Sequence, residues 1–260
     1  MRKKPECTPP TQTRNMDSDF THALRPDGID ACPGCGMDVP HFVVWGKRMA
    51  ECEPCQAAER ERKRHNQRRE DALAAWQHLT PAEFRRKIEP WLLAPQLRAA
   101  MDLDGATGVG FAGASGGGKT RVAYSLLRKA AGRGLTPFAT TAAEYRQAAA
   151  NRHHSDPSVR GEAVATLRNA SQCQALLLDD IGKGATTATG DEALSDLLND
   201  RYKSRRLTFW TLNGSSDWLR MRLGPDHGPA ILRRMVDLTR PHQGAKPQVF
   251  VCGEDGKEEG

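Results

Sequence analysis

The chain has 260 residues, which predicts one large domain or a domain plus an appendage, and 38% of them are hydrophobic, enough to build a core. Its net charge is +6, no apolar run approaches the ~18 residues that a membrane helix needs, and its first ten residues lack the apolar core of a signal peptide. We therefore expect a cytoplasmic protein that does not cross a membrane, with its seven cysteines as thiols or metal ligands rather than disulfides.

The N-terminal part predicts an unstructured segment followed by a metal module. Residues 1–30 combine prolines and scattered charge without periodicity, which indicates a disordered lead-in. Two Cys-x-x-Cys pairs follow within residues 31–56, separated by 16 residues, a spacing typical of tetrahedral Zn²⁺ sites. Four thiolates leave no coordination position open, so the predicted role is structural; a redox role, which needs only one pair, is the alternative. The predicted zinc ligands are Cys32, Cys35, Cys52 and Cys55.

The next stretch is strongly basic. Residues 60–69 hold six Lys and Arg residues and one acidic residue, a local net charge of +5 against +6 for the whole chain. Because they contain no glycine, proline or apolar stripe, they predict an exposed helix. Such a run is most often a solvated face, but its place beside a zinc module raises the expectation of a contact with nucleic-acid phosphates. Residues 57–94 are assigned to this basic helix and to linker helices, one of which should open with a capping box at Thr80 and Glu83.

The strongest motif is GASGGGKT at residues 113–120, which fits Gly-x-x-x-x-Gly-Lys-Thr in full. It follows an apolar, strand-like stretch and precedes a helical pattern, and this context argues against a flexible Gly-Ser linker. Glycines let backbone N–H groups turn inward and hold phosphates together with the helix N-terminus. Lys119 is predicted to reach the β- and γ-phosphates of ATP, and the Thr120 hydroxyl to bind Mg²⁺. The predicted nucleotide-binding residues are Gly113, Ala114, Ser115, Gly116, Gly117, Gly118, Lys119, Thr120 and Asp179.

Two neighbouring acids complete this predicted site. Residues 175–182 read ALLLDDIG, which predicts a buried strand that ends at a pair of carboxylates. Taken alone, the acids could simply be turn residues. A magnesium ion beside a phosphate loop needs a carboxylate, however, so Asp179 is predicted to hold Mg²⁺ with Thr120, and Asp180 to orient or polarise the attacking water.

Strand-like runs alternate with helix-like stretches after the phosphate loop. The runs lie at residues 136–141, 174–180, 206–212 and 247–252. This alternation predicts a mostly parallel sheet covered by helices, so the fold expected from the pattern is a three-layer α/β P-loop core over residues 95–252. Thr141 and Glu144 form a second capping box, which should open a helix. Residues 253–260 are acidic and glycine-rich and predict a flexible tail.

Four segments of the core together resemble the AAA+ ATPases of the DnaC-type replicative helicase loaders and their relatives, the IstB-type transposition helpers. The segments are GASGGGKT, LLLDDIGKG, RYKSRRLTFWTLNGSSDWL and ILRRM. The resemblance implies an AAA+ fold that binds ATP and Mg²⁺, here with an N-terminal zinc-ribbon-like module. It also implies that Asn213 senses the γ-phosphate and that Arg234 is an arginine finger donated to the nucleotide of a neighbouring subunit. The family's Arg-Tyr pair matches Arg201 and Tyr202.

The implied catalytic set is Lys119, Asp180, Asn213 and Arg234, with Arg233, Arg220 and Arg222 as rivals for the last position. The expected function is that of a helicase-loader-like ATPase in DNA replication, slow and stimulated by assembly or DNA. Its expected partners are a replicative helicase, single-stranded DNA and further copies of itself in an ATP-dependent homo-oligomer. Two alternatives stay open: an IstB-like transposition helper, and a zinc-dependent nucleic-acid-binding adaptor that binds ATP without significant hydrolysis.

Overall fold

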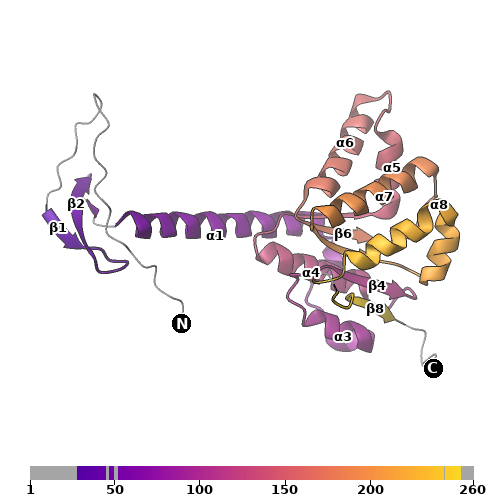
Figure 1. The fold of residues 1–260 in the computed structure, drawn as a ribbon, viewed down its shortest axis with the longest axis horizontal. Coiled ribbons are helices and arrows are strands. Elements are labelled where there is room, and N and C mark those ends of the chain that lie inside the picture. The colour runs from indigo at the N-terminus through magenta and orange to yellow at the C-terminus, as the bar shows by residue number, and fades with distance from the viewer. Residues whose placement is uncertain (1–27, 45–46, 50–51, 243, 253–260) are drawn as a thin grey trace. The chain divides into compact units, whose positions relative to one another are not determined.

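A computed structural model describes residues 28–44, 47–49, 52–242 and 244–252 (Figure 1). Most of the predicted lead-in and the whole predicted tail at 253–260 lie outside these residues. The chain divides into two compact units, Met1–Gln67 and Arg68–Gly260. None of the helices in the described ranges combines the length and the hydropathy that crossing a bilayer requires.

The first unit contains a small antiparallel sheet with the order β1-β2-β3. Its strands are β1 (Gly28–Ala31), β2 (Asp38–Val44) and β3 (Lys47–Met49). The turn after β1 carries the first cysteine pair, and the backbone N–H of Gly36 closes it by donating to the Cys32 carbonyl over 2.7 Å. Among the side chains that the structure describes here, Cys32, Val39 and Cys52 are buried hydrophobic residues, with Cys35 and Cys55 packed against them. The cysteine side chains therefore pack against one another inside this module.

Helix α1 (Glu53–Leu79) begins at the second cysteine pair. Residues 60–71 are all exposed, which confirms the prediction of an exposed basic helix. Its C-terminal part is anchored in the second unit, because Ala72 and Trp76 are buried there. The Trp76 indole Nε1 donates to the carbonyl of Tyr124 over 3.1 Å.

A five-stranded parallel sheet with the order β5-β6-β7-β4-β8 forms the centre of the second unit (Figure 1). Its strands are β4 (Val109–Gly113), β5 (Pro137–Thr141), β6 (Ala175–Asp179), β7 (Leu207–Thr211) and β8 (Val249–Cys252). The strands coincide with the apolar runs of the sequence, so the predicted three-layer α/β core is confirmed.

Helices cover both faces of this sheet. In chain order they are α2 (Ala82–Arg85), the 3₁₀ helix η1 (Pro90–Leu92), α3 (Pro95–Met101), α4 (Lys119–Gly132), α5 (Ala142–Asn151), α6 (Pro157–Gln172), α7 (Ala188–Lys203) and α8 (Ser216–Asp237). Helices α3 and α4 pack on one face, and α5 to α8 on the other. Side chains alternate accordingly along β6, since Leu177 joins the first cluster and Leu176 and Leu178 join the second.

One of the two predicted capping boxes is present. The Thr141 hydroxyl accepts the backbone N–H of Glu144 over 3.1 Å, and the Glu144 carboxylate accepts the backbone N–H of Thr141 over 2.9 Å. The box predicted at Thr80 is wrong: α2 has Pro81 as its N-cap and no side-chain cap. Thr80 follows the last residue of α1 and donates its hydroxyl to the carbonyl of Trp76 over 2.6 Å. The same carbonyl also accepts the backbone N–H of Thr80 over 3.0 Å, so Thr80 closes the end of α1 instead of opening α2.

Candidate nucleotide-binding site and cysteine cluster

The GASGGGKT segment forms a tight loop between β4 and α4. Gly113, Gly116 and Gly118 have φ values of 117°, 88° and 89°, a region that other residues adopt only with strain. A Cβ atom on Gly113 would lie 1.9 Å from the carbonyl oxygen of Cys252, so a side chain there has no room. The backbone conformation thus needs the glycines that the motif supplies.

Lys119 is the first residue of α4, and its side chain is buried. The ammonium Nζ donates to the carbonyls of Gly113 and Ala114 over 3.0 and 2.5 Å. Burial lowers the pKa of Lys119, and the nearby Cys252, Asp180 and Asp179 act in the opposite direction. The ammonium group therefore lies inside the loop that the sequence predicts to hold phosphates.

Thr120 and Asp179, which are 59 residues apart, are in direct contact. The Thr120 hydroxyl donates to Asp179 Oδ1 over 3.0 Å, and the Thr211 hydroxyl donates to the same oxygen over 2.5 Å. Burial raises the pKa of Asp179, whereas these two hydrogen bonds act to lower it. A hydroxyl and a carboxylate at the end of a buried strand are hard oxygen donors of the kind that Mg²⁺ prefers. The two residues predicted to bind Mg²⁺ thus fit that ion chemically.

Asp180 turns its carboxylate towards the end of the next strand. It has a φ of 55°, in the left-handed region. The Asn213 amide donates to Asp180 Oδ1, and the backbone N–H of Asp180 donates to the Thr211 hydroxyl over 2.9 Å. Gly113 and Gly214 exchange two backbone hydrogen bonds of 3.2 and 3.1 Å. The turn that carries Asn213 is therefore bonded to the first residue of the phosphate loop.

Arg234 lies apart from this cluster, on α8. Its Nε donates to Asn199 Oδ1 over 2.9 Å, and its guanidinium group stacks 4.5 Å from the centre of the Tyr202 ring. Within the described chain we find no contact between Arg234 and the other three predicted catalytic residues. Its neighbour Arg233 is 79% exposed. Arg201, the other matched arginine, is fully buried and donates to the carbonyls of Ala170 and Cys173 and to the Thr208 hydroxyl, which is a structural role.

The sequence interpretation missed Thr211. This residue joins the two acids, since its hydroxyl donates to Asp179 and accepts the backbone N–H of Asp180. The available signal was the Thr-x-Asn pattern at residues 211–213, which places a hydroxyl on the strand beside the two carboxylates.

We expect Thr211→Val to lower Mg²⁺-dependent ATP turnover about tenfold, because it leaves the backbone N–H of Asp180 without a partner and removes one of the two hydroxyl donors to the buried Asp179 carboxylate, at about 1–3 kcal/mol for each lost bond. Thr211→Ser, which keeps the hydroxyl, is the matched control and should behave like the wild type. Turnover measured across a range of Mg²⁺ concentrations checks this. A Thr211→Val variant with a wild-type Mg²⁺ profile would contradict it.

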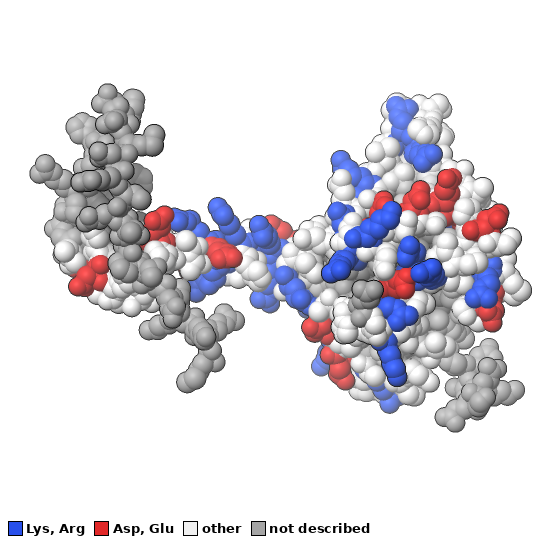
Figure 2. Space-filling model, viewed as in Figure 1, with Lys and Arg blue, Asp and Glu red and all other residues white. Residues whose placement is uncertain are grey.

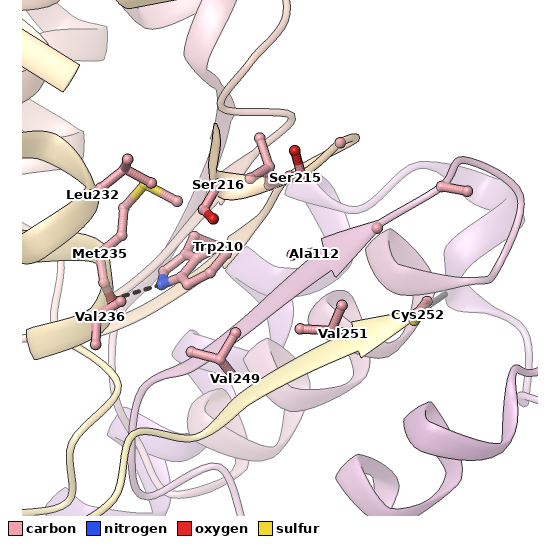
Figure 3. Close-up of a pocket in the computed structure, with 14 residues that line it drawn as sticks. Ala112, Trp210, Ser215, Ser216, Leu232, Met235, Val236, Val249, Val251 and Cys252 are labelled. Atoms are coloured by element: carbon pink, nitrogen blue, oxygen red, sulfur yellow. Dashed lines mark hydrogen bonds between the residues drawn. The ribbon is translucent and has the colours of Figure 1, made fainter. Parts of the chain in front are cut away.

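Two cavities border the loop. The smaller has a volume of about 270 Å³. It is lined by loop glycines, two apolar side chains, one acidic and one basic side chain, namely Gly116, Gly118, Ile88, Leu93, Glu89 and Arg121. The larger, about 670 Å³, is lined mainly by apolar residues from β7, β8 and α8 (Figure 3). In it the Trp210 indole donates to the carbonyl of Met235 over 2.9 Å. The larger cavity has no charged side chain among the described residues that line it, so its chemistry does not suit phosphate groups.

The four cysteines of the first unit form one cluster. Their Sγ atoms all lie within 4.8 Å of one another, and Cys52 Sγ is 3.8 Å from that of Cys32 and 3.6 Å from that of Cys35. A tetrahedral site with Zn–S bonds of about 2.3 Å has S···S edges of about 3.8 Å. The backbone N–H of Cys52 lies 3.5 Å from Cys32 Sγ and is the main cause that lowers the pKa of Cys32 to about 6. The cluster thus has the dimensions of a Cys₄ zinc site.

A known protein family matches most of this chain. A family model described as "IstB-like ATP binding protein" matches residues 51–242. No curated protein matches significantly in sequence. The crystal structure of DnaI is similar, with a TM-score of 0.50 and 17% identity over 66% of this chain and 94% of that one.

Two further solved structures are similar at lower scores. The DnaC helicase loader gives a TM-score of 0.43 and 18% identity over 60% of this chain and 85% of that one. Domain III of the Thermotoga maritima replication initiation protein DnaA gives 0.49 and 14% over 66% and 68%. At these identities the likeness concerns the fold.

Proposed function

The chain belongs to the family of IstB-like ATP binding proteins, and from this premise we propose that it is an ATPase that regulates the loading of a replicative helicase on single-stranded DNA. The observation that carries the proposal is the meeting of three groups at one end of the parallel sheet: the Lys119 ammonium, the Thr120–Asp179 pair and the Asp180–Asn213 pair. This arrangement has a place for phosphates, for a metal ion and for an attacking water.

In the proposed reaction, the loop N–H groups and Lys119 bind the phosphates of ATP, while Thr120 and Asp179 hold Mg²⁺. When bound, Mg²⁺ neutralises charge on the phosphate oxygens. Asp180 orients the attacking water, and Asn213 fixes the Asp180 carboxylate and contacts the γ-phosphate. The adenosine end fits the 270 Å³ cavity beside Gly116 and Gly118, which offers apolar surface and polar groups together.

The link between Gly113 and Gly214 supports a switch. Because two backbone bonds join the phosphate loop to the turn after Asn213, a change at the γ-phosphate is passed to the start of α8, where Ser215 caps the helix. Such a protein acts by favouring one conformation with ATP and another after hydrolysis.

Arg234 is proposed to complete the site of a neighbouring subunit in an ATP-dependent homo-oligomer. To do so it must leave Asn199 and Asp237, which hold it by hydrogen bonds of 2.9 and 3.3 Å. If Arg234 is released on assembly, we expect slow turnover by the isolated chain and faster turnover by the oligomer.

We expect Arg234→Ala to lower assembly-stimulated turnover ~10³-fold, the effect typical of an arginine finger, with ATP affinity unchanged. Arg233→Ala is the matched control, because it removes an equal charge from the adjacent, 79% exposed position. Steady-state turnover at rising protein concentration measures both. If the Arg233→Ala variant loses activity and Arg234→Ala does not, the assignment is wrong.

The basic segment of α1 is the proposed contact for DNA. Lys and Arg side chains lie along the helix (Figure 2), and all of residues 60–71 are exposed. Phosphate contacts by such side chains supply sequence-independent affinity that falls with salt. The Cys₄ cluster next to it is proposed to bind Zn²⁺ and to shape an adaptor that grips the helicase.

The family match also favours a second candidate, a helper ATPase in transposition. The two functions differ in their partner, so we would incubate the protein with the host's replicative helicase and a circular single-stranded DNA, with ATP or ADP. ATP-dependent transfer of the helicase onto the circle is the expected result. Failure of transfer, together with ATP-dependent binding to a transposase, would favour the second function.

A further inference from the structure

Arg146 carries a charge in the interior of the second unit. It lies on α5 with 4% of its surface exposed, and its Nε donates to Oδ1 of Asp191, on α7, over 2.7 Å. Asp191 is equally buried. A buried ion pair is weak evidence for stability, because a well-packed apolar pair of similar volume is often as stable or more so. The position of this charge therefore calls for another explanation.

The guanidinium group holds the segment that follows Asp180. Its Nη1 donates to the carbonyl of Ile181 over 3.3 Å and to the carbonyl of Lys183 over 3.2 Å. Room for it depends on Gly190, where a Cβ would lie 3.0 Å from the Arg146 side chain. Only a guanidinium group offers donors in a fixed fork that can reach a carboxylate and two carbonyls at once.

The segment it holds is strained at its first residue. Asp180 has a φ of 55°, a conformation that costs of order 1–3 kcal/mol and persists only when its surroundings impose it. Here the surroundings act through hydrogen bonds to Asp180 and to the residues that follow it. The backbone N–H groups of Asp180 and Ile181 donate to the hydroxyl and carbonyl of Thr211, and the N–H of Lys183 donates to the carbonyl of Asp180 over 2.9 Å. Arg146 supplies two further bonds, to the carbonyls of Ile181 and Lys183.

Arg146 Nη2 is buried without a hydrogen-bond partner among the described residues. An arginine that served only to fill the interior would be expected to have its donors satisfied. Nη1 of this arginine instead donates to the carbonyls of Ile181 and Lys183, while Nη2 has no partner among the described residues. The guanidinium group therefore pairs with Asp191 through Nε and holds the backbone after Asp180 through Nη1.

We propose that Arg146 is a positioning residue for ATP hydrolysis. By holding the carbonyls of Ile181 and Lys183, it keeps Asp180 in the strained backbone conformation that directs its carboxylate to Asn213. The inference rests on the proposed ATPase function. It adds a residue on α5 that touches neither nucleotide nor metal and acts through Asp180.

The test is the double variant Arg146→Met/Asp191→Leu, which replaces both charges by apolar groups of similar size. We would measure its thermal midpoint and its kcat and KM for ATP, with Arg152→Met at the exposed end of α5 as the control. The expected result is a melting temperature near that of the wild type, KM within about twofold, and kcat lowered at least tenfold. If the ion pair only stabilised the fold, the apolar pair would replace it without loss of kcat. Wild-type kcat in a folded double variant therefore overturns the inference.

A second variant covers the case in which the double variant does not fold. Arg146→Lys keeps a cation opposite Asp191 but cannot reach both carbonyls, so kcat should again fall with KM unchanged; wild-type kcat overturns the inference. The wild-type rate distinguishes a failure of the proposed function from a failure of the inference about Arg146. No turnover by the wild type under any condition would overturn the proposed function and this inference with it, whereas active wild type and equally active variants overturn the inference alone.

Discussion

Replacing Lys119 with alanine is expected to weaken ATP binding about 100-fold. The loop loses the ammonium group that lies within 3.0 Å of the Gly113 and Ala114 carbonyls. A charge-assisted hydrogen bond contributes about 1.5–3 kcal/mol, and each 1.4 kcal/mol is tenfold in affinity. Isothermal titration with Mg²⁺·ATP measures the loss directly.

Lys203→Ala is the matched control, since it removes the same charge from an exposed position on α7. It should bind ATP as the wild type does. Thermal melting of both variants distinguishes a local loss of ATP binding, with the melting temperature unchanged, from a loss of fold stability. Wild-type ATP affinity retained by a folded Lys119→Ala variant would contradict the assignment of the phosphate loop.

Replacing Cys32 with serine is expected to release zinc and unfold the cysteine module while ATP binding survives. Cys32 is fully buried and packs in one hydrophobic cluster with Val39 and Cys52, among the described residues of the first unit. In such small sites the free energy of metal binding, about 10–16 kcal/mol in zinc-finger peptides, supplies the free energy of folding. The second unit has two hydrophobic clusters of its own. Metal analysis, limited proteolysis and ATP titration report on the three effects.

Cys7→Ser serves as the control, because this cysteine has no partner at a metal-binding spacing in the sequence. It should retain one zinc per chain and the proteolysis pattern of the wild type. Wild-type protein purified under reducing conditions without any zinc would contradict the assignment of the cluster.

Motifs with a strict physical requirement were predictable from the sequence. The phosphate loop needs glycines at positive φ, and Gly113, Gly116 and Gly118 have it. Thr120 and Asp179 were predicted to lie together because a magnesium ion beside a phosphate loop needs a carboxylate, and their side chains are in contact. The fold followed from the same alternation of strands and helices.

Contacts made by single side chains between distant elements were not predictable. The cap at Thr80 was wrong because its hydroxyl had a second option, the carbonyl of Trp76 at the end of α1. Arg146 looks like any polar residue of an alanine-rich helix until α7 and the segment after Asp180 are packed against it. Such roles depend on tertiary neighbours, which local pattern does not encode.

The most direct test of the proposed ATP-driven switch is ATP turnover by the purified protein, with and without single-stranded DNA, beside the Asp180→Asn variant. We predict slow turnover that DNA stimulates, and its loss in the variant while ATP affinity is retained, because the amide keeps the shape of the carboxylate but not its charge. Tight ATP binding with no turnover by the wild type under any condition would contradict it, and would indicate an adaptor for which ATP is only a ligand.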